Sequence, residues 1–147
     1  MIVAAASIFS WILTSNQVTE MVANAILGQT QNVVVVLLLI NLVLLVVGLF
    51  MEPVAAITIL TPVLLPVVTA LGVDPVHFGI MMILNLMLGL LTPPVGMVLY
   101  VLARVADIKF ESAVRATAPF LIPLVIVLLL ITYVPAVSMW LPELLYR

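Results

Sequence analysis

The stretch GLLTPPVGMVLY, residues 89–100, interrupts a segment that is otherwise apolar enough to cross a membrane. Proline in a helix interior removes a backbone donor and clashes with the preceding turn, at a cost of about 3 kcal/mol or more. Pro93 and Pro94 therefore cannot continue the helix that precedes them. We predict a broken helix whose first half ends near Leu91.

The residues around the prolines suit a second half-helix. Pro94 fits its first turn, where a missing N–H costs nothing, and Thr92 is predicted to be its N-cap. Gly96 allows close approach of the backbone. The prolines leave the carbonyls of Gly89 and Leu90 without their usual donors.

Unpaired carbonyls cost several kcal/mol each in hydrocarbon unless a partner satisfies them. A sodium ion is a hard cation that takes oxygen ligands, and secondary transporters build such sites from discontinuous helices. The alternative is a plain proline kink that Thr92 or a neighbouring helix repairs. The stretch alone leaves both interpretations open.

The composition places the chain in lipid. Of 147 residues, 67% are hydrophobic and 7% are charged, against roughly 45–50% and about 25% in soluble domains. The four basic residues give no footprint for nucleic acid. The absence of cysteine excludes thiolate metal sites and cysteine nucleophiles. No serine has a plausible neighbouring base, so we do not expect an enzyme.

The apolar runs predict an all-α integral membrane protein with a re-entrant helical hairpin and a proline-broken helix. The predicted segments are the end of a transmembrane helix (1–16), an interfacial helix (17–31), a helical hairpin (33–70), a broken transmembrane helix (78–103) and a last transmembrane helix (117–142). An ordinary polar loop is equally compatible with the second segment. The N-terminus lacks the basic region of a signal peptide, so we expect a fragment of a longer chain.

The hairpin prediction depends on the junction after residues 33–51. This apolar run leads directly into Glu52 and Pro53 and then into another apolar run, with no polar loop between them. Two full spans would put Glu52 at a membrane surface, whereas a re-entrant hairpin would put it inside the membrane, shielded by protein. An ionisable residue at membrane depth indicates function by default, although Glu52-Pro53 is also a helix-start signature.

Charge predicts the orientation. Arg104, Lys109 and Arg115 cluster between the last two predicted segments, and the positive-inside bias makes that loop cytoplasmic. Asp74 and His77 then face outward, with His77 expected at the surface.

Two amides lie within apolar runs. Asn41 and Asn85 are expected to form interhelical hydrogen bonds, which is commoner than a ligand role.

Five motifs in register carry a family resemblance. They are N-x-x-L-L-x-x-G-x-x-x-E (41–52), I-L-T-P-V-L-L-P-V-V (59–68), G-V-D-P-V-H-F-G-I (72–80), G-L-L-T-P-P-V-G (89–96) and A-P-F-L (118–121). In this order they resemble the C-terminal part, the second inverted repeat, of the large membrane subunit of TRAP transporters. These are the tripartite ATP-independent periplasmic carriers.

The resemblance implies half of an inverted-repeat, elevator-type transporter in a bacterial inner membrane. It implies sodium as the coupling ion and organic anions as substrates, such as C4-dicarboxylates or sugar acids. The implied partners are a small TRAP membrane subunit, a soluble periplasmic substrate-binding protein, the missing N-terminal repeat of the same subunit and membrane lipid. Without that repeat, this chain alone is not expected to transport.

The resemblance also assigns candidate site residues. Residues 48–52 match the hairpin tip of the family, and residues 89–96 match its helix break. The candidate sodium site comprises Gly48, Glu52, Gly89, Leu90 and Thr92, and the candidate substrate site comprises Thr92, Pro93, Pro94 and Gly96. The family often has aspartate at position 52, whereas this chain has glutamate, which keeps the charge but lengthens the reach.

Two other readings remain open. One is another hairpin-containing ion-coupled carrier, such as a divalent-anion symporter or an antibiotic-type exporter. The other is a structural or pore-forming membrane segment in which the prolines are only kinks.

Overall fold

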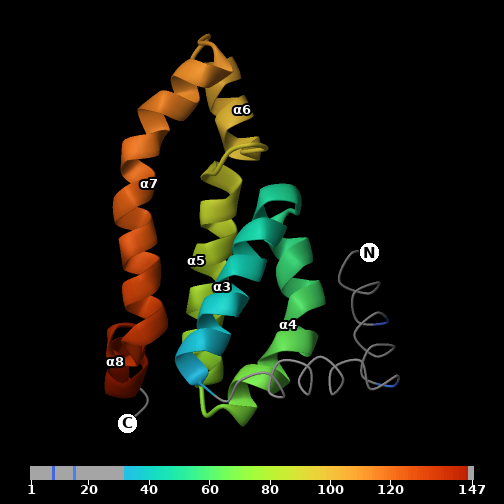
Figure 1. The fold of residues 1–147 in the computed structure, drawn as a ribbon, viewed down its shortest axis with the longest axis vertical. Helices are drawn as coiled ribbons and strands as arrows, with labels where there is room; N and C mark the ends of the chain where they lie inside the picture. The colour runs from blue at the N-terminus through green and yellow to red at the C-terminus, as the bar shows by residue number, and fades with distance from the viewer. Residues whose placement is uncertain (1–7, 9–14, 16–31, 146–147) are drawn as a thin grey trace.

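The structure is a computed structural model that describes Ile8, Ser15 and residues 32–145. In this part of the chain all regular structure is helical, with α3 (Val33–Phe50), α4 (Pro53–Ala70), α5 (Pro75–Leu91), α6 (Met97–Val105), α7 (Phe110–Tyr133) and α8 (Pro135–Leu145) (Figure 1). Helices α3, α4 and α7 are each long and apolar enough to cross a membrane. The predicted class, an all-α membrane protein, is confirmed. The segments predicted over 1–16 and 17–31 lie outside the described residues, apart from Ile8 and Ser15.

Helices α3 and α4 form a hairpin whose two arms begin and end at capping side chains. Asn32 caps α3, since its side chain accepts the N–H of Val34 at 3.0 Å. At the tip, the Glu52 carboxylate accepts the N–H of Ala55 at 3.0 Å, and Pro53 starts α4. These are the preferred positions of a polar cap and of a helix-starting proline. In Figure 1 the open ends of both arms lie at one end of the molecule.

Helix α5 is the centre of the fold and packs against α3, α4, α7 and α8. It begins at Pro75 because the Asp74 carboxylate accepts the N–H groups of Val76 at 2.7 Å and His77 at 3.4 Å. The apolar side chains buried around it include Leu37, Ile40 and Leu44 of α3, Leu64 and Val68 of α4, Phe78, Met82 and Leu86 of α5, and Leu128 of α7. Burial of these side chains sets the position of α5 within the bundle.

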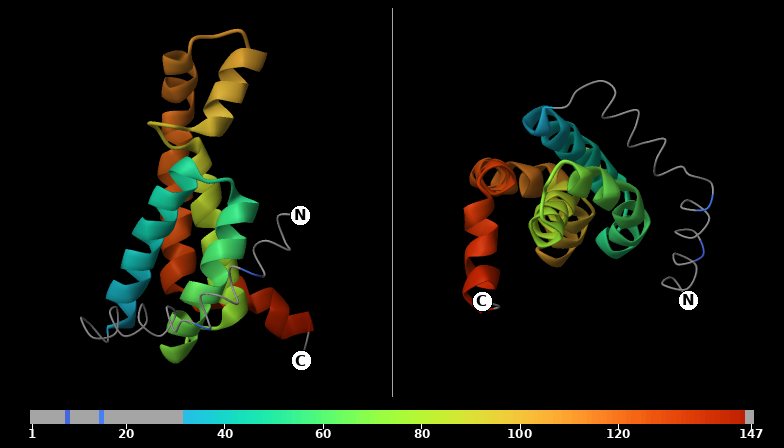
Figure 2. Two further views of the ribbon diagram at one scale, coloured as in Figure 1. Left: turned by 90° about the vertical axis from the view of Figure 1, so that its right-hand side faces the viewer. Right: turned by 90° about the horizontal axis from the view of Figure 1, so that it is seen from below.

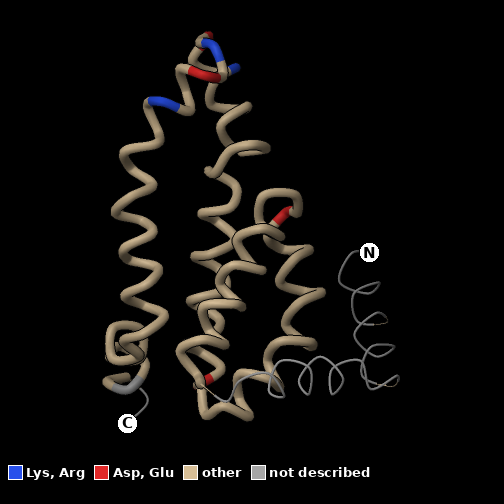
Figure 3. The backbone as a smooth tube through the Cα atoms, in the orientation of Figure 1, with Lys and Arg blue, Asp and Glu red and all other residues tan. Residues whose placement is uncertain are grey.

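Helices α6 and α7 form a corner that projects beyond the hairpin. The rings of Tyr100 and Phe110 stack across it with centroids 4.2 Å apart. Among residues 32–145, the Lys and Arg positions of the backbone gather at this corner, as Figure 3 shows, and the hairpin tip stops short of it. The nine residues of α6 correspond to about 13 Å of helix. This placement favours a re-entrant hairpin, because the tip does not reach the basic end of the molecule.

The boundaries of the last two predicted segments differ from the prediction. The broken helix, predicted over 78–103, runs from Pro75 to Val105. The last span, predicted over 117–142, is two helices, because Val134 precedes Pro135 and has φ −120° and ψ 84°. A residue before proline is disfavoured in the helical region. Helix α8 consequently runs in a different direction from α7 (Figure 2), while its first turn stays against α5 through the Ser138–His77 contact.

Candidate functional site

The helix break lies between α5 and α6. Thr92 is extended, with φ −98° and ψ 129°, and is the C-cap of α5. Its N–H donates to the carbonyl of Gly89 at 3.0 Å, and its hydroxyl donates to the carbonyl of Leu88 at 2.7 Å. The prediction that Thr92 is the N-cap of the second half-helix is therefore wrong. The hydroxyl instead finds an acceptor one turn back in its own helix.

The second half-helix starts later than predicted. Helix α6 begins at Met97 rather than in the turn containing Pro94, and its N-cap is Gly96 with φ 53° and ψ 58°. This left-handed conformation favours glycine. A Cβ at this position would also stand 2.9 Å from the Leu99 side chain. Gly96 therefore serves the turn into α6.

The break leaves two main-chain oxygens of α5 without donors. The prediction named the carbonyls of Gly89 and Leu90, but Thr92 satisfies Gly89. Within residues 32–145, no hydrogen bond reaches the carbonyls of Leu90 and Leu91. The residue four places after Leu90 is Pro94, which has no N–H. The open oxygens therefore lie one position further along than predicted.

The hairpin tip has a matching set of open oxygens. Helix α3 ends with the Met51 N–H donating to the Val47 carbonyl at 2.9 Å. In the described part of the chain, the carbonyls of Gly48 and Leu49 receive no hydrogen bond. For Leu49 the residue four places on is Pro53, which has no N–H.

Two glycines bring these helix ends together. A Cβ added to Gly89 would stand 2.5 Å from the carbonyl carbon of Gly48 and 2.9 Å from its carbonyl oxygen. A Cβ added to Gly48 would stand 2.9 Å from the carbonyl oxygen of Leu86. Only glycine fits such a crossing. The two residues are 41 positions apart, so no local pattern in the sequence could reveal the contact.

The crossing places two helix C-termini side by side, which has an electrostatic consequence. Each C-terminus carries roughly half a negative charge from its unsatisfied carbonyls. Two such ends repel one another in a medium of low dielectric constant, and a bound cation would relieve that repulsion. The N-termini of α4 and α6 start just beyond the same tip and break, and they carry the complementary positive ends.

The site offers a cation main-chain and hydroxyl oxygens. No three His, Asp or Glu side chains come together among the residues that the structure describes. The acidic side chain nearest in sequence to the tip, that of Glu52, is exposed and caps α4. Carbonyl oxygens and one hydroxyl form a donor set that suits a hard cation.

A series of side-chain hydrogen bonds links α3, α5 and α7, one to two helical turns before the glycine crossing. The Nδ2 of Asn85 donates to the Oδ1 of Asn41, and the Nδ2 of Asn41 donates to the Oγ1 of Thr132 at 3.0 Å. All three side chains are buried. The expected interhelical role of the two amides is confirmed, and Thr132 is a partner that the sequence analysis missed.

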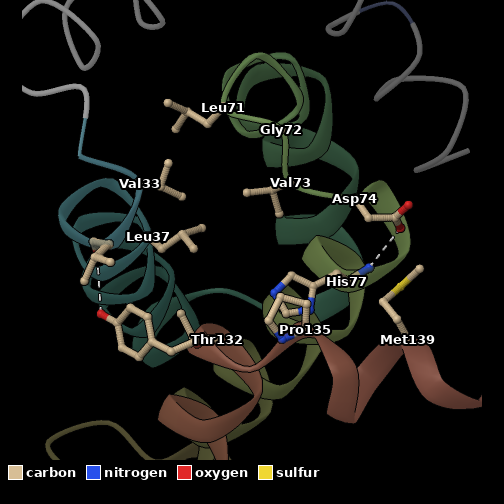
Figure 4. Close-up of a pocket in the computed structure, with 12 residues that line it drawn as sticks. Val33, Leu37, Leu71, Gly72, Val73, Asp74, His77, Thr132, Pro135 and Met139 are labelled. Atoms are coloured by element: carbon tan, nitrogen blue, oxygen red, sulfur yellow. Dashed lines mark hydrogen bonds between the residues drawn. The ribbon is translucent and has the colours of Figure 1, made fainter.

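A separate cavity of about 450 Å³ lies at the open end of the hairpin, away from the break (Figure 4). His77 lines it and is 2% exposed, so the prediction of a surface histidine is wrong. Its Nδ1 lies 2.6 Å from the Oγ of Ser138, which in turn donates to the carbonyl of Pro135 at 3.0 Å. This contact ties α5 to α8, a helix that lies far along the sequence.

Comparison with known proteins agrees with this architecture. The family model described as "Tripartite ATP-independent periplasmic transporter, DctM component" matches residues 1–137. The sialic acid TRAP transporter large permease protein SiaM of Vibrio cholerae is 49% identical over 144 residues, which are 98% of this chain and 34% of that protein. The C4-dicarboxylate TRAP transporter large permease protein DctM of Pseudomonas aeruginosa is 41% identical over 142 residues, or 97% of this chain and 33% of that protein.

A third relative has a different substrate in its name. The 2,3-diketo-L-gulonate TRAP transporter large permease protein YiaN of Escherichia coli is 36% identical over 134 residues, covering 91% of this chain and 32% of that protein. The chain thus spans about a third of the length of these relatives. They are transport permeases rather than enzymes, as predicted, and the match favours the TRAP resemblance over the other carrier types considered. The chain belongs to the DctM family, the DctM component of the tripartite ATP-independent periplasmic transporters.

Proposed function

We propose that this chain is the second inverted repeat of the large permease subunit of a sodium-coupled secondary transporter that imports organic anions. The observation that carries the proposal is the convergence of two helix C-termini at the Gly48–Gly89 crossing. Their open carbonyls are the kind of feature that ion-coupled carriers place at the membrane midplane.

The proposed sodium site uses oxygens from both sides of the crossing. The carbonyls of Gly48 and Leu90 and the hydroxyl of Thr92 are the proposed ligands. Gly89, a candidate ligand from the sequence, is reassigned to close packing, because its carbonyl already accepts the Thr92 N–H. Glu52 is reassigned to capping α4, because its carboxylate accepts the Ala55 N–H.

The proposed substrate site lies on the other side of the tip and the break. Helix N-termini attract anions, and α4 and α6 both begin there. Thr92, Pro93, Pro94 and Gly96 remain the candidate substrate contacts. The names of the relatives refer to sialic acid, C4-dicarboxylates and 2,3-diketo-L-gulonate, all organic acids, which supports a carboxylate substrate here.

The activity requires partners outside this chain. Because the chain spans about a third of its relatives, we infer that the first repeat supplies the remaining ion and substrate ligands. A small membrane subunit and a soluble periplasmic binding protein complete the proposed carrier in the bacterial inner membrane. The basic α6–α7 corner supports a cytoplasmic position for that end.

The test is sodium-driven uptake by the full-length parent permease, reconstituted with its partners, with Pro93 and Pro94 both changed to Ala. Alanines restore N–H groups, so α5 can continue and close the Leu90 carbonyl. We expect at least a tenfold rise in the sodium concentration for half-maximal uptake. The matched control changes Pro119 and Pro123 of α7 to Ala, a pair of prolines remote in sequence from the site.

The uptake assay has two outcomes that contradict the proposal. Wild-type sodium affinity and rate in the Pro93→Ala/Pro94→Ala variant would show that the open carbonyls have no coupling role. A cation leak without saturable, sodium-dependent uptake by the wild-type protein would support a pore-forming segment instead.

A further inference from the structure

The Asn85–Asn41–Thr132 chain of hydrogen bonds has a fixed direction. The Thr132 hydroxyl donates to the Leu128 carbonyl at 2.7 Å, so it must accept from Asn41 at its other side. This orients the Asn41 amide, whose Oδ1 then accepts from Asn85. Donation therefore runs from α5 through α3 to α7.

This series of hydrogen bonds ends on an atom that has no hydrogen-bond partner. Asn85 is 0% exposed, and its Oδ1 is buried with no hydrogen-bond partner in the described structure. A buried acceptor without a donor lowers stability, whereas replacing both polar partners by apolar groups of similar shape is nearly neutral or stabilising. If the pair only packed α3 against α5, leucines at both positions would give a more stable protein than the two asparagines do.

The position of the asparagine pair relates it to the break. Asn41 lies seven residues before Gly48 in α3, which is about two turns, and Asn85 lies four residues before Gly89 in α5, about one turn. Each asparagine therefore shares a helix face with the glycine above it. A shift of α3 along α5 would break the Asn41–Asn85 bond and misalign the two glycines together.

We infer that Asn41 and Asn85 are positioning residues for the proposed sodium site, and that Thr132 anchors them to α7. They set the register of the hairpin arm against the broken helix, and so fix the distance between the open carbonyls of the tip and those of the break. This inference rests on the proposed function. The asparagine pair lowers the stability of the folded protein, because the Oδ1 of Asn85 is buried without a partner.

The experiment separates positioning from simple stabilisation in the full-length parent permease. The variant Asn41→Leu/Asn85→Leu removes both amides at once. We expect its thermal unfolding temperature without sodium to equal or exceed that of the wild type, and its sodium concentration for half-maximal uptake to rise at least tenfold. The single variant Asn41→Leu, which strands Asn85, is expected to unfold at a lower temperature.

A second variant and a control complete the design. Thr132→Val keeps the Asn41–Asn85 bond but removes its anchor on α7, and a rise of about threefold in the half-saturating sodium concentration is expected. If the double variant does not fold, the sodium dependence of Thr132→Val tests the inference in its place. The control is Thr61→Val, since the Thr61 hydroxyl contacts the sulfur of Met82 at 3.8 Å between α4 and α5; it should leave sodium dependence unchanged.

Three outcomes overturn the inference. The first is wild-type sodium dependence in the double variant. The second, which applies if the double variant does not fold, is wild-type sodium dependence in Thr132→Val. The third is a fall in the unfolding temperature of the double variant that parallels its loss of sodium affinity. If the wild-type protein shows no sodium dependence at all, the proposed function fails first. If the wild type is sodium-dependent and the double variant matches it, only the positioning role fails.

Discussion

Gly89 of α5 lies so close to Gly48 of α3 that a Cβ on Gly89 would stand 2.7 Å from the Gly48 Cα. This contact joins the last turn of the hairpin arm to the last turn before the proline break. It is the point at which two helix ends with open carbonyls meet, and the proposed sodium site depends on it.

Changing Gly89 to Ala should separate the two helix ends. Overpacking of this kind typically costs about 1–3 kcal/mol, and we expect a lower unfolding temperature together with at least a tenfold loss of sodium affinity in uptake assays. Gly79 lies in the same helix and a Cβ there meets nothing within 4 Å. Gly79→Ala is therefore the matched control and should keep wild-type sodium affinity. Equal effects of the two substitutions would contradict the role of the crossing.

The Thr92 hydroxyl is expected to be a ligand as well as a cap. Thr92→Val removes the hydroxyl and should raise the half-saturating sodium concentration about tenfold, whereas Thr92→Ser should stay within threefold of the wild type. Thr117 in α7 makes the same kind of bond, to the Ala113 carbonyl at 2.9 Å. Sodium titration of uptake should show no change for Thr117→Val. An unchanged titration for Thr92→Val would remove Thr92 from the site.

Substitutions of Glu52 distinguish the effect of its charge on sodium affinity from the effect of its cap on the stability of α4. Glutamine can still accept the Ala55 N–H, so Glu52→Gln should keep sodium affinity within threefold of the wild type. Glu52→Ala removes the cap and should cost about 1 kcal/mol of stability. Thermal unfolding and sodium-dependent uptake measure the two effects separately. A tenfold loss of affinity in Glu52→Gln would restore Glu52 as a direct ligand.

The His77–Ser138 contact should matter for stability but not for coupling. Ser138→Ala leaves the buried Nδ1 of His77 without its partner, and an unsatisfied buried polar group costs about 1–3 kcal/mol. We expect a lower unfolding temperature with unchanged sodium dependence of uptake. A changed sodium dependence would indicate that the open end of the hairpin communicates with the break.

These 147 residues contain no cysteine, so single cysteines introduced here can report the orientation by labelling. Ala106 lies at the basic α6–α7 corner and Ala70 at the open end of the hairpin, and both are exposed. In a cysteine-free parent permease in spheroplasts, a membrane-impermeant maleimide should label Ala70→Cys but not Ala106→Cys. The reverse pattern would invert the proposed topology.

The sequence was sufficient for the fold class, the hairpin and the break because those features are local. Long apolar runs, the Glu52-Pro53 junction and the doubled proline each act within one or two helical turns. The role of Thr92 was predicted wrongly because its hydroxyl could cap either half-helix, and the geometry of the turn decides between them. His77 follows Asp74 and Pro75 in what resembles a surface loop, but α8 returns from far along the chain to cover it.

The candidate site was predictable only in outline. The prolines indicated where carbonyls would be left open, yet the actual open oxygen after Leu90 is that of Leu91, because Thr92 turns back to Gly89. The contact between Gly48 and Gly89 depends on the packing of α3 against α5, which no spacing in the sequence encodes. The same holds for the partnership of Asn41 with Thr132.

The most direct test of the central claim is a high-resolution map of the full-length permease in saturating sodium and in sodium-free choline buffer. The account predicts a spherical density peak between the carbonyls of Gly48 and Leu90, present in sodium and absent in choline. Carbonyls capped by side-chain or main-chain donors in both maps, with no such peak, would contradict it.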